Sequence, residues 1–275
     1  MPSLDSIVCA TRQRVAKERR TADVRAWEGM AAGHTPRGFR ARLQNAARNG
    51  IAIIAELKKA SPSKGLIRAD FHAAELAKDL QQAGAAALSV LTDAEFFQGS
   101  LENLQRASAV TELPCLRKDF IVDEIQILEA RAHRADAILL IVAALQQTDL
   151  TAFAHQAQSL DLDVLCEVHD ETELLRALDA GCDLIGVNNR DLRTFHVDLD
   201  IAFRLAEKVP ARCLRIAESG IHSAQDVARL RSAGYDAFLI GESLMREENP
   251  GQALMNLIES AARVEFSSKL EARSS

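Results

Sequence analysis

The sequence predicts an α/β protein built from one repeated strand–helix unit. From residue 51 onward, short aliphatic segments alternate with amphipathic ones, and three of the units consist of a helix, an Ala-Gly pair and an apolar strand. Aromatic residues make up only 4% of the chain, so the core must be aliphatic, as it is where helices pack on a sheet. These observations predict parallel strands that are buried on both faces.

Eight segments have the length and apolar character of such strands. They are Ile51–Leu57, Ala86–Leu91, Leu113–Phe120, Ala137–Ala143, Asp163–Val168, Asp183–Asn188, Leu214–Glu218 and Ala237–Ile240. Eight strands in about 200 residues match a closed (β/α)8 barrel, the TIM barrel. The alternative is an open doubly wound sheet, which the sequence disfavours because no GxGxxG follows the first strand and no strand is polar like a sheet edge.

Amphipathic segments between the strands predict the surrounding helices. Three of them end at a glycine that is expected to cap the helix: Ala73–Ala83 before Gly84, Glu171–Ala180 before Gly181, and Ser223–Ala233 before Gly234. Residues 1–48 are expected to form an N-terminal helical extension packed on the barrel, as an amphipathic helix lying on the body. Residues 49–264 then form the barrel domain, and residues 265–275 form a polar, disordered tail.

Charge is unevenly distributed along the chain, whose net charge is −6. The first 50 residues contain ten Lys and Arg against four acidic residues, while the remainder contains 23 against 35. The basic segment carries acidic residues among its arginines and lacks the interleaved aromatic residues of a nucleic-acid platform. We therefore expect no nucleic-acid partner.

Several absences in the sequence limit the other partners and the location. The longest apolar run, Ala137–Leu145, has nine residues, well short of the ~20 that span a bilayer. The N-terminus lacks the pattern of a secretory signal, and the five cysteines include no CxxC and no His at metal-ligand spacing. We expect a cytoplasmic protein with reduced thiols, no metal and no membrane partner. No apolar surface patch is evident, so a monomer or a weak homo-oligomer is expected.

Polar side chains follow five of the predicted strands at their C-terminal ends, where barrels of this kind place their chemistry. They are Glu56 and Lys58, Lys118, Glu167, Asn188, and Glu218. One charge after a strand is usually solvated or paired at the surface, but these six would share one cavity. Mixed charges at close range move pKa values apart, which supplies an acid and a base at neutral pH.

A second group of small residues follows the last two strands. Ser219-Gly220 and Gly241-Glu242 stand where barrels often bind phosphate, and glycine lets the backbone approach a ligand closely. The basic loop from Lys59 to Gly65 is expected to close over an anionic substrate as a lid. His169, after the fifth strand, could equally be a neighbour of a helix cap or a catalytic residue.

Six motifs occur in order along the chain: IIAELKKASPSKG, LRKDF, LCEVHD, IGVNNRDL, RIAESGI and FLIGESLM. With them the sequence resembles the indole-3-glycerol phosphate synthase family over roughly residues 1 to 262. The resemblance implies closure of the indole ring of 1-(2-carboxyphenylamino)-1-deoxyribulose 5-phosphate, with loss of carbon dioxide and water. It also implies that neither metal nor organic cofactor is needed, and that the substrate is a sugar phosphate carrying an anthranilate ring.

The resemblance further implies roles for individual residues. Lys118 would be the general acid that protonates the ketone oxygen, and Glu167 the acid or base of the later proton transfers. Glu56 and Lys58 would complete the catalytic group, while Asn188 and Glu218 would hold hydroxyl and amine groups. Phosphate and the aromatic ring would be held by the remaining candidates, which are Ser61, Phe97, Arg190, Leu192, Ser219, Gly220, Ile240, Gly241 and the backbone of Glu242.

Two positions differ from some members of the family. Asn189 and Glu242 stand where a serine can occur. The carboxylate of Glu242 would repel phosphate, so that only its backbone N–H is expected to contribute.

Other functions stay open at the level of sequence. One is another sugar-phosphate-binding barrel, either an isomerase or a lyase such as an aldolase in which Lys118 forms a Schiff base. Another is a catalytically inactive barrel that serves as a binding scaffold. Such a scaffold is expected to have lost one of Glu56, Lys58, Lys118 and Glu167, and all four are present.

Overall fold

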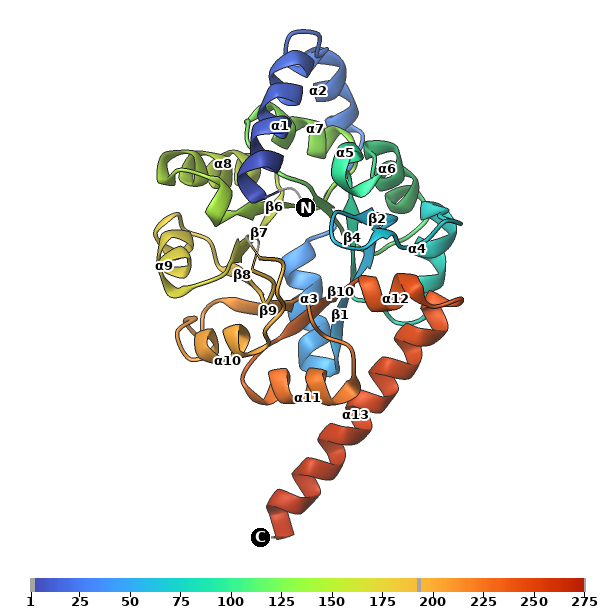
Figure 1. Cartoon of the computed structure of the whole chain (residues 1–275). Helices are drawn as coiled ribbons and strands as arrows, with labels where there is room; N and C mark the ends of the chain where they lie inside the picture. Colours follow the sequence, from blue (N-terminus) through green and yellow to red (C-terminus); the bar gives the residue numbers. More distant parts are fainter. Residues whose placement is uncertain (1–2, 192–193, 275) are drawn as a thin grey trace.

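Eight parallel strands form a closed barrel in the computed structural model, which describes residues 3–191 and 194–274 (Figure 1). They are β1 (Ala52–Leu57), β4 (Ala87–Leu91), β5 (Cys115–Lys118), β6 (Ala137–Ile141), β7 (Asp163–Val168), β8 (Leu184–Asn188), β9 (Leu214–Glu218) and β10 (Ala237–Ile240). The first and last strands pair from Ala52 opposite Ala237 to Ala55 opposite Ile240. This closure confirms the predicted barrel and excludes the open sheet.

Helices surround the barrel between successive strands and after the last one. They are α4 (Ala73–Gln82), α5 (Ala94–Phe97), α6 (Leu101–Ala109), α7 (Ile125–Ala132), α8 (Gln147–Ser159), α9 (Glu171–Asp179), α10 (Asp200–Ala206), α11 (Ala224–Ser232), α12 (Glu242–Arg246), α13 (Pro250–Ser274) and the 3-10 turn Val142–Ala144. The three predicted C-cap glycines, Gly84, Gly181 and Gly234, have φ angles of 93°, 81° and 99°. This left-handed conformation ends each helix as predicted.

Strand side chains alternate between two separate apolar cores. Ile54, Leu116 and Leu165 point into the barrel, whereas neighbours such as Ile53 and Cys166 pack against the helices. Because the period of a strand is two residues, the inward side chains continue along each strand toward the barrel mouth. The same alternation therefore turns the polar residues at the strand ends into the barrel.

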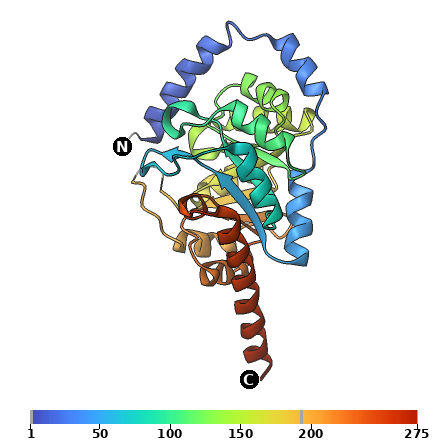
Figure 2. The ribbon, with the colours of Figure 1, turned by 90° about the vertical axis from the view of Figure 1, so that its right-hand side faces the viewer.

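The N-terminal extension contains three helices, α1 (Leu4–Glu18), α2 (Val24–Ala32) and α3 (Phe39–Asn49). The first two form an arch along one side of the barrel, and α3 lies at the end opposite the N-terminus (Figure 2). Phe39 and Leu43 of α3 are completely buried in the inner core, so this helix closes the bottom of the barrel. The extension, for which the sequence predicts helical structure packed on the barrel, thus consists of three separate helices.

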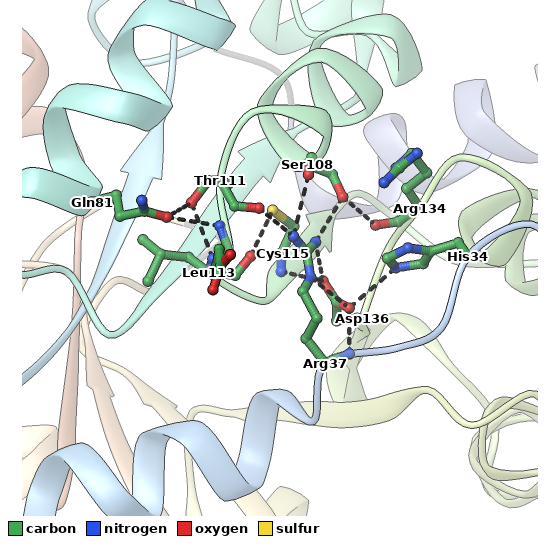
Figure 3. A network of polar contacts seen from close by, with 10 residues as sticks. His34, Arg37, Gln81, Ser108, Thr111, Leu113, Cys115, Arg134 and Asp136 are labelled. Carbon is green, nitrogen blue, oxygen red and sulfur yellow. Dashed lines mark hydrogen bonds and ion pairs between the residues drawn. The ribbon is translucent and has the colours of Figure 1, made fainter.

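A buried carboxylate fixes the segment between α2 and α3 to the barrel (Figure 3). Asp136, just before β6, is fully buried and accepts hydrogen bonds from the backbone N–H of Arg37 at 2.7 Å and of Cys115 at 2.6 Å. Its oxygens also contact Arg37 Nη2 at 2.6 Å and His34 Nε2 at 3.2 Å. Burial opposes its ionisation, but these donors outweigh burial and lower the pKa of Asp136.

The C-terminal helix α13 extends away from the barrel (Figure 1). Its helical backbone includes residues 265–274, for which the sequence predicts disorder, so that expectation differs from the structure. Six of these ten residues are Glu, Lys, Leu, Ala or Arg, which are strong helix formers and extend the preceding helix. Across the described residues, no helix combines the length and the apolar character needed to cross a membrane.

Candidate active site

The polar strand ends surround a cavity of about 160 Å³ at the mouth of the barrel. All predicted site residues that the structure describes line it: Glu56, Lys58, Ser61, Phe97, Lys118, Glu167, Asn188, Arg190, Glu218, Ser219, Gly220, Ile240, Gly241 and Glu242. Leu192, the remaining candidate, lies outside the described residues. Closure of the barrel brings together side chains that are more than 180 residues apart in the sequence.

Lys118 lies at the centre of the cluster. Its Nζ is 2.9 Å from Oε2 of Glu167 and 3.2 Å from Oε2 of Glu218. Burial disfavours the charged ammonium, but Glu167 and Glu218 outweigh it and raise the pKa of Lys118 above its usual value. The side chain is therefore a protonated donor at neutral pH.

The two carboxylates beside Lys118 have opposite pKa shifts. Burial opposes ionisation of Glu167, yet the charges of Lys118 and His169 outweigh it and lower its pKa to about 2. In Glu218 burial prevails over Lys118, and the charge of Glu167 adds to it, so that the pKa rises to about 7. One carboxylate is thus ionised at neutral pH, while the other exchanges its proton there.

A second ion pair lies on β1. Lys58 Nζ is 2.7 Å from Oε1 of Glu56, whose other oxygen accepts a hydrogen bond from Ser89 at 3.4 Å. Burial disfavours the charge of Glu56, but Lys58 and Lys118 outweigh it and lower the pKa of Glu56. The cavity therefore holds two ammonium groups and ionised carboxylates as counter-charges.

Small residues in the turns after β9 and β10 line another part of the cavity. Ser219 and Gly220 both have left-handed backbone conformations, with φ angles of 66° and 77°. At Gly241 a Cβ would lie 2.6 Å from Oε1 of Glu56, so the close approach of β10 to β1 requires glycine. Glu242 Oε1 accepts a hydrogen bond from Arg246 at 3.1 Å, so its carboxylate is already paired.

The loop after β1 forms a short hairpin at the rim of the cavity. Strands β2 (Ala60–Ser61) and β3 (Gly65–Leu66) pair in antiparallel fashion. The side chain of Ser61 is buried, and its Oγ has no hydrogen-bond partner among the described residues. This oxygen is therefore available to a ligand. Lid closure of residues 59–65 stays a prediction.

Arg190 joins two parts of the rim. Its backbone N–H donates to Asn188 Oδ1 at 3.0 Å, which orients the amide at the end of β8. Its Nη2 lies 4.0 Å from Oε2 of Glu242. An arginine is thus placed beside the turns after β9 and β10.

Apolar side chains form much of the remaining wall, and several of them were not predicted from the sequence. The ring of Phe97 lies 6.2 Å from that of Phe120, and Leu4 and Ile7 of α1 face the same cavity. Phe120 could have been found, because it has the same strand parity as Lys118. Leu4 and Ile7 give no such signal, since only the path of the extension brings them to the mouth.

His169 was the weakest of the candidates and lies directly behind Glu167. Its Nε2 is 3.5 Å from Oε1 of Glu167, and its Nδ1 is 2.9 Å from Oε2 of Glu173. Asp170, the next residue, caps α9 by accepting a hydrogen bond from the backbone N–H of Glu173. The position is therefore both next to a helix cap and in contact with the site.

The described residues contain no group of three or more His, Cys, Asp or Glu side chains arranged to hold a metal ion. The ionisable groups at the mouth instead form ion pairs with one another. The arrangement offers a buried ammonium donor, a carboxylate that is ionised at neutral pH and a carboxylate that titrates near pH 7. These groups are suited to proton transfer on a bound anion.

Solved structures similar to this chain show the fold. The 3-hexulose-6-phosphate synthase of Salmonella typhimurium matches with a TM-score of 0.62 and 12% identity, covering 79% of this chain and 99% of its own. A thiamine phosphate pyrophosphorylase of Pyrococcus furiosus matches with a TM-score of 0.60 and 17% identity, covering 79% and 98%. At these identities the likeness concerns the barrel alone.

Sequence comparison is more specific. The family model described as indole-3-glycerol phosphate synthase matches residues 4–257. A protein of that name from Koribacter versatilis is 60% identical over 256 residues, covering 93% of this chain and 98% of its own. Another from Polaromonas sp. is 50% identical over 258 residues, covering 92% and 97%. The chain therefore belongs to the indole-3-glycerol phosphate synthase family.

Proposed function

We propose that this enzyme converts 1-(2-carboxyphenylamino)-1-deoxyribulose 5-phosphate to indole-3-glycerol phosphate, carbon dioxide and water, a step of tryptophan biosynthesis. The observation that carries the proposal is the ammonium of Lys118, held between Glu167 and Glu218 inside the mouth of a barrel of this family. The reaction needs an acid beside a ketone and a base nearby, and this cluster contains both kinds of group.

The substrate has two ends that the cavity can hold apart. The phosphate would bind at the turns of Ser219-Gly220 and Gly241, with the free hydroxyl of Ser61 and the charge of Arg190 nearby. The anthranilate ring would pack on Phe97 and its neighbours. Phosphate binding away from the reacting carbons then uses remote binding energy to bring the ring carbon against the ketone.

In the first step, the ring carbon that bears the carboxylate attacks the ketone carbon. The Nζ proton of Lys118 goes to the ketone oxygen, which becomes a hydroxyl, while the new carbon–carbon bond closes a five-membered ring. Donation to the developing alkoxide stabilises the transition state, an effect commonly worth ~10² to 10⁴ in rate. Lys58, paired with Glu56, would meet the negative charge of the substrate carboxylate.

The later steps restore the aromatic system. The carbon–carboxylate bond breaks, carbon dioxide leaves, and its electron pair returns to the ring. The hydroxyl then takes up a second proton, supplied by solvent, and departs as water, while Glu167 removes the proton of the carbon next to nitrogen. Because the carboxylate leaves as a neutral molecule, one proton is consumed overall. A pKa of about 2 keeps Glu167 ionised and ready to accept the proton from the carbon next to nitrogen.

The scheme uses only side chains, so we propose that the enzyme is a decarboxylating carbon–carbon lyase that works without metal or organic cofactor. The five cysteines are free, which agrees with a reducing compartment, and we place the protein in the cytoplasm as a monomer or weak homo-oligomer.

The proposal is tested by adding the substrate to the purified protein with EDTA present and following indole fluorescence. Fluorescence should rise, and Lys118→Ala should reduce turnover by at least ~10² with little change in substrate binding, because its proton acts in the transition state. Glu167→Gln should also reduce turnover strongly. If the protein is well folded but indole fluorescence does not rise, another sugar-phosphate lyase or isomerase would be favoured. Borohydride trapping at Lys118 would then identify an aldolase.

A further inference from the structure

Behind the ion pair of Glu167 and Lys118, a third charged layer is formed by His169 and Glu173. His169 is the first residue after β7, and Glu173 lies in the first turn of α9. Oε2 of Glu173 accepts two hydrogen bonds from the same residue, from the backbone N–H of His169 at 2.8 Å and from its Nδ1 at 2.9 Å. The imidazole ring is thus held at two points.

This arrangement determines the protonation of the ring. Nδ1 must carry a proton to donate to a carboxylate, so a neutral His169 would have a bare Nε2. Nε2 faces Oε1 of Glu167 at 3.5 Å, and two lone pairs pointed at each other would repel. A second proton, on Nε2, removes this conflict and turns the contact into a charge-assisted hydrogen-bond donor for Glu167.

The surrounding charges favour the doubly protonated ring. Glu167 of β7, Glu173 of α9 and Glu218 of β9 all act on it, and the side chain is only 13% exposed. Burial disfavours the charged ring, but these carboxylates outweigh it and raise the pKa of His169. Among the described residues Nε2 of His169 has no hydrogen-bond partner. No other acceptor therefore competes with Glu167 for its proton.

We propose that His169, held by Glu173, is a positioning residue that keeps the carboxylate of Glu167 aimed at the reacting atoms. One oxygen of Glu167 is held by Lys118 and the other is turned toward His169. When Lys118 turns to the substrate ketone, Glu167 loses its stronger partner. The imidazolium then remains to hold the carboxylate in place and ionised until it accepts its proton. This role rests on the proposed function of Glu167.

Two substitutions separate the two nitrogens of the ring. The amide nitrogen of His169→Gln can stand near Nε2, while that of His169→Asn stands near Nδ1 and leaves Oε1 of Glu167 without the donor that Nε2 supplies. We expect His169→Asn to reduce kcat by about tenfold or more with KM nearly unchanged, because Glu167 acts on the reaction rather than on ground-state binding. His169→Gln should retain several-fold more activity than His169→Asn.

The pH dependence of kcat is a second measurement, and a purely structural role of His169 would not change it. In the wild-type enzyme kcat should decline at alkaline pH as His169 loses its second proton, and this decline should be absent in His169→Gln. Glu173→Gln still accepts a hydrogen bond but lacks the charge, so it should shift the decline to lower pH. His155→Asn, an exposed histidine on α8, is the matched control and should leave kcat and its profile unchanged.

Nitrogen NMR of the ligand-free protein tests the protonation without any activity. At neutral pH both ring nitrogens of His169 should carry protons, and Glu173→Gln should lower the midpoint of their titration. A bare Nε2 at neutral pH, or wild-type kcat and profile in His169→Asn, would overturn the proposal. If the wild-type protein formed no indole-3-glycerol phosphate, the proposed function of the site would be rejected instead. The NMR result does not depend on that function.

Discussion

At the residue scale, the site depends on two chemically identical carboxylates that are given different pKa values. Glu167 and Glu218 are both 1% exposed and both contact Lys118. Glu167 lies closer to the ammonium and has His169 behind it, whereas Oε1 of Glu218 has no hydrogen-bond partner among the described residues. The better-compensated carboxylate stays ionised, and we propose that the free oxygen of the other accepts a hydrogen bond from the amine of the substrate.

Titration of Glu218 should be visible in the pH dependence of kcat/KM. Its pKa of about 7 means that the carboxylate becomes protonated as pH falls through 7 and no longer accepts a hydrogen bond from the substrate amine. We expect kcat/KM to decrease below about pH 7 in the wild-type enzyme, and this inflection to disappear in Glu218→Gln.

The control for this profile is the substrate itself, whose phosphate ionises near pH 6. That inflection should be present with both proteins. An unchanged inflection near pH 7 in Glu218→Gln would assign it to another group.

At the element scale, the strands place the site through their period of two and their closure. Glu56 continues the inward series of Ala52 and Ile54, so the sequence pattern predicts its direction. The hairpin of β2 and β3 was not predicted, because strands of two residues carry no periodic signal. Short helices such as α12 escape prediction for the same reason.

Gly241 is a backbone position where this packing leaves no room for a side chain. In Gly241→Ala the new Cβ would lie 2.6 Å from Oε1 and 2.8 Å from Cβ of Glu56, so that β10 or Glu56 must move. We expect kcat/KM to fall by at least about tenfold, with a loss of stability of about 1–3 kcal/mol, as in other overpacked sites. Steady-state kinetics and thermal unfolding measure the two effects.

Gly29→Ala is the matched control, because a Cβ there meets nothing within 4 Å and the residue is exposed in α2. It should leave activity unchanged and stabilise the helix by about 0.5–1 kcal/mol. Wild-type kinetics in Gly241→Ala would show that activity does not depend on the position of Glu56 seen in this structure.

At the scale of the whole molecule, the N-terminal extension connects the two ends of the barrel. Helix α3 closes the bottom with Phe39 and Leu43, while Leu4 and Ile7 of α1 reach the cavity at the mouth. Arg19 joins α1 to the barrel through ion pairs of 2.8 Å with Asp123 and 2.9 Å with Glu124. These exposed ion pairs contribute little to stability, so the buried network around Asp136 is expected to be the main polar attachment of the extension to the barrel.

Removing the buried carboxylate should therefore release the extension. Asp136→Ala leaves Arg37, His34 and the backbone N–H of Cys115 without their acceptor, and we expect a loss of about 3–5 kcal/mol in the free energy of unfolding. Because the folded pKa is lowered, this contribution is present above the ordinary value of about 4 and is lost as pH falls below it. Urea unfolding at about pH 7 and pH 3 measures both effects.

Glu102→Ala removes an exposed ion pair with Arg106 and serves as the control, with an expected change within about 0.5 kcal/mol. Equal losses in the two variants would show that the network around Asp136 is no stronger than a surface pair.

The closed barrel and its eight strands could be predicted from the sequence, and so could the polar strand ends that line the cavity. Apolar runs and helix-capping glycines repeat along the chain, and polar residues stand at the same end of five of the strands, so local pattern and topology agree. Roles for Lys118 and Glu167 came from ordered motifs, not from spacing.

How these residues interact depends on contacts that exist only in the folded chain. Whether Lys118 contacts Glu167, Glu218 or Glu56 depends on barrel closure and side-chain direction, and the opposite pKa shifts follow from burial and from those contacts. The contact of His169 with Glu167, and the path that carries Leu4 and Ile7 to the mouth, likewise involve elements far apart in the chain. Such contacts are absent from sequence patterns because periodicity records which face a residue occupies, whereas distances in three dimensions set electrostatic energies.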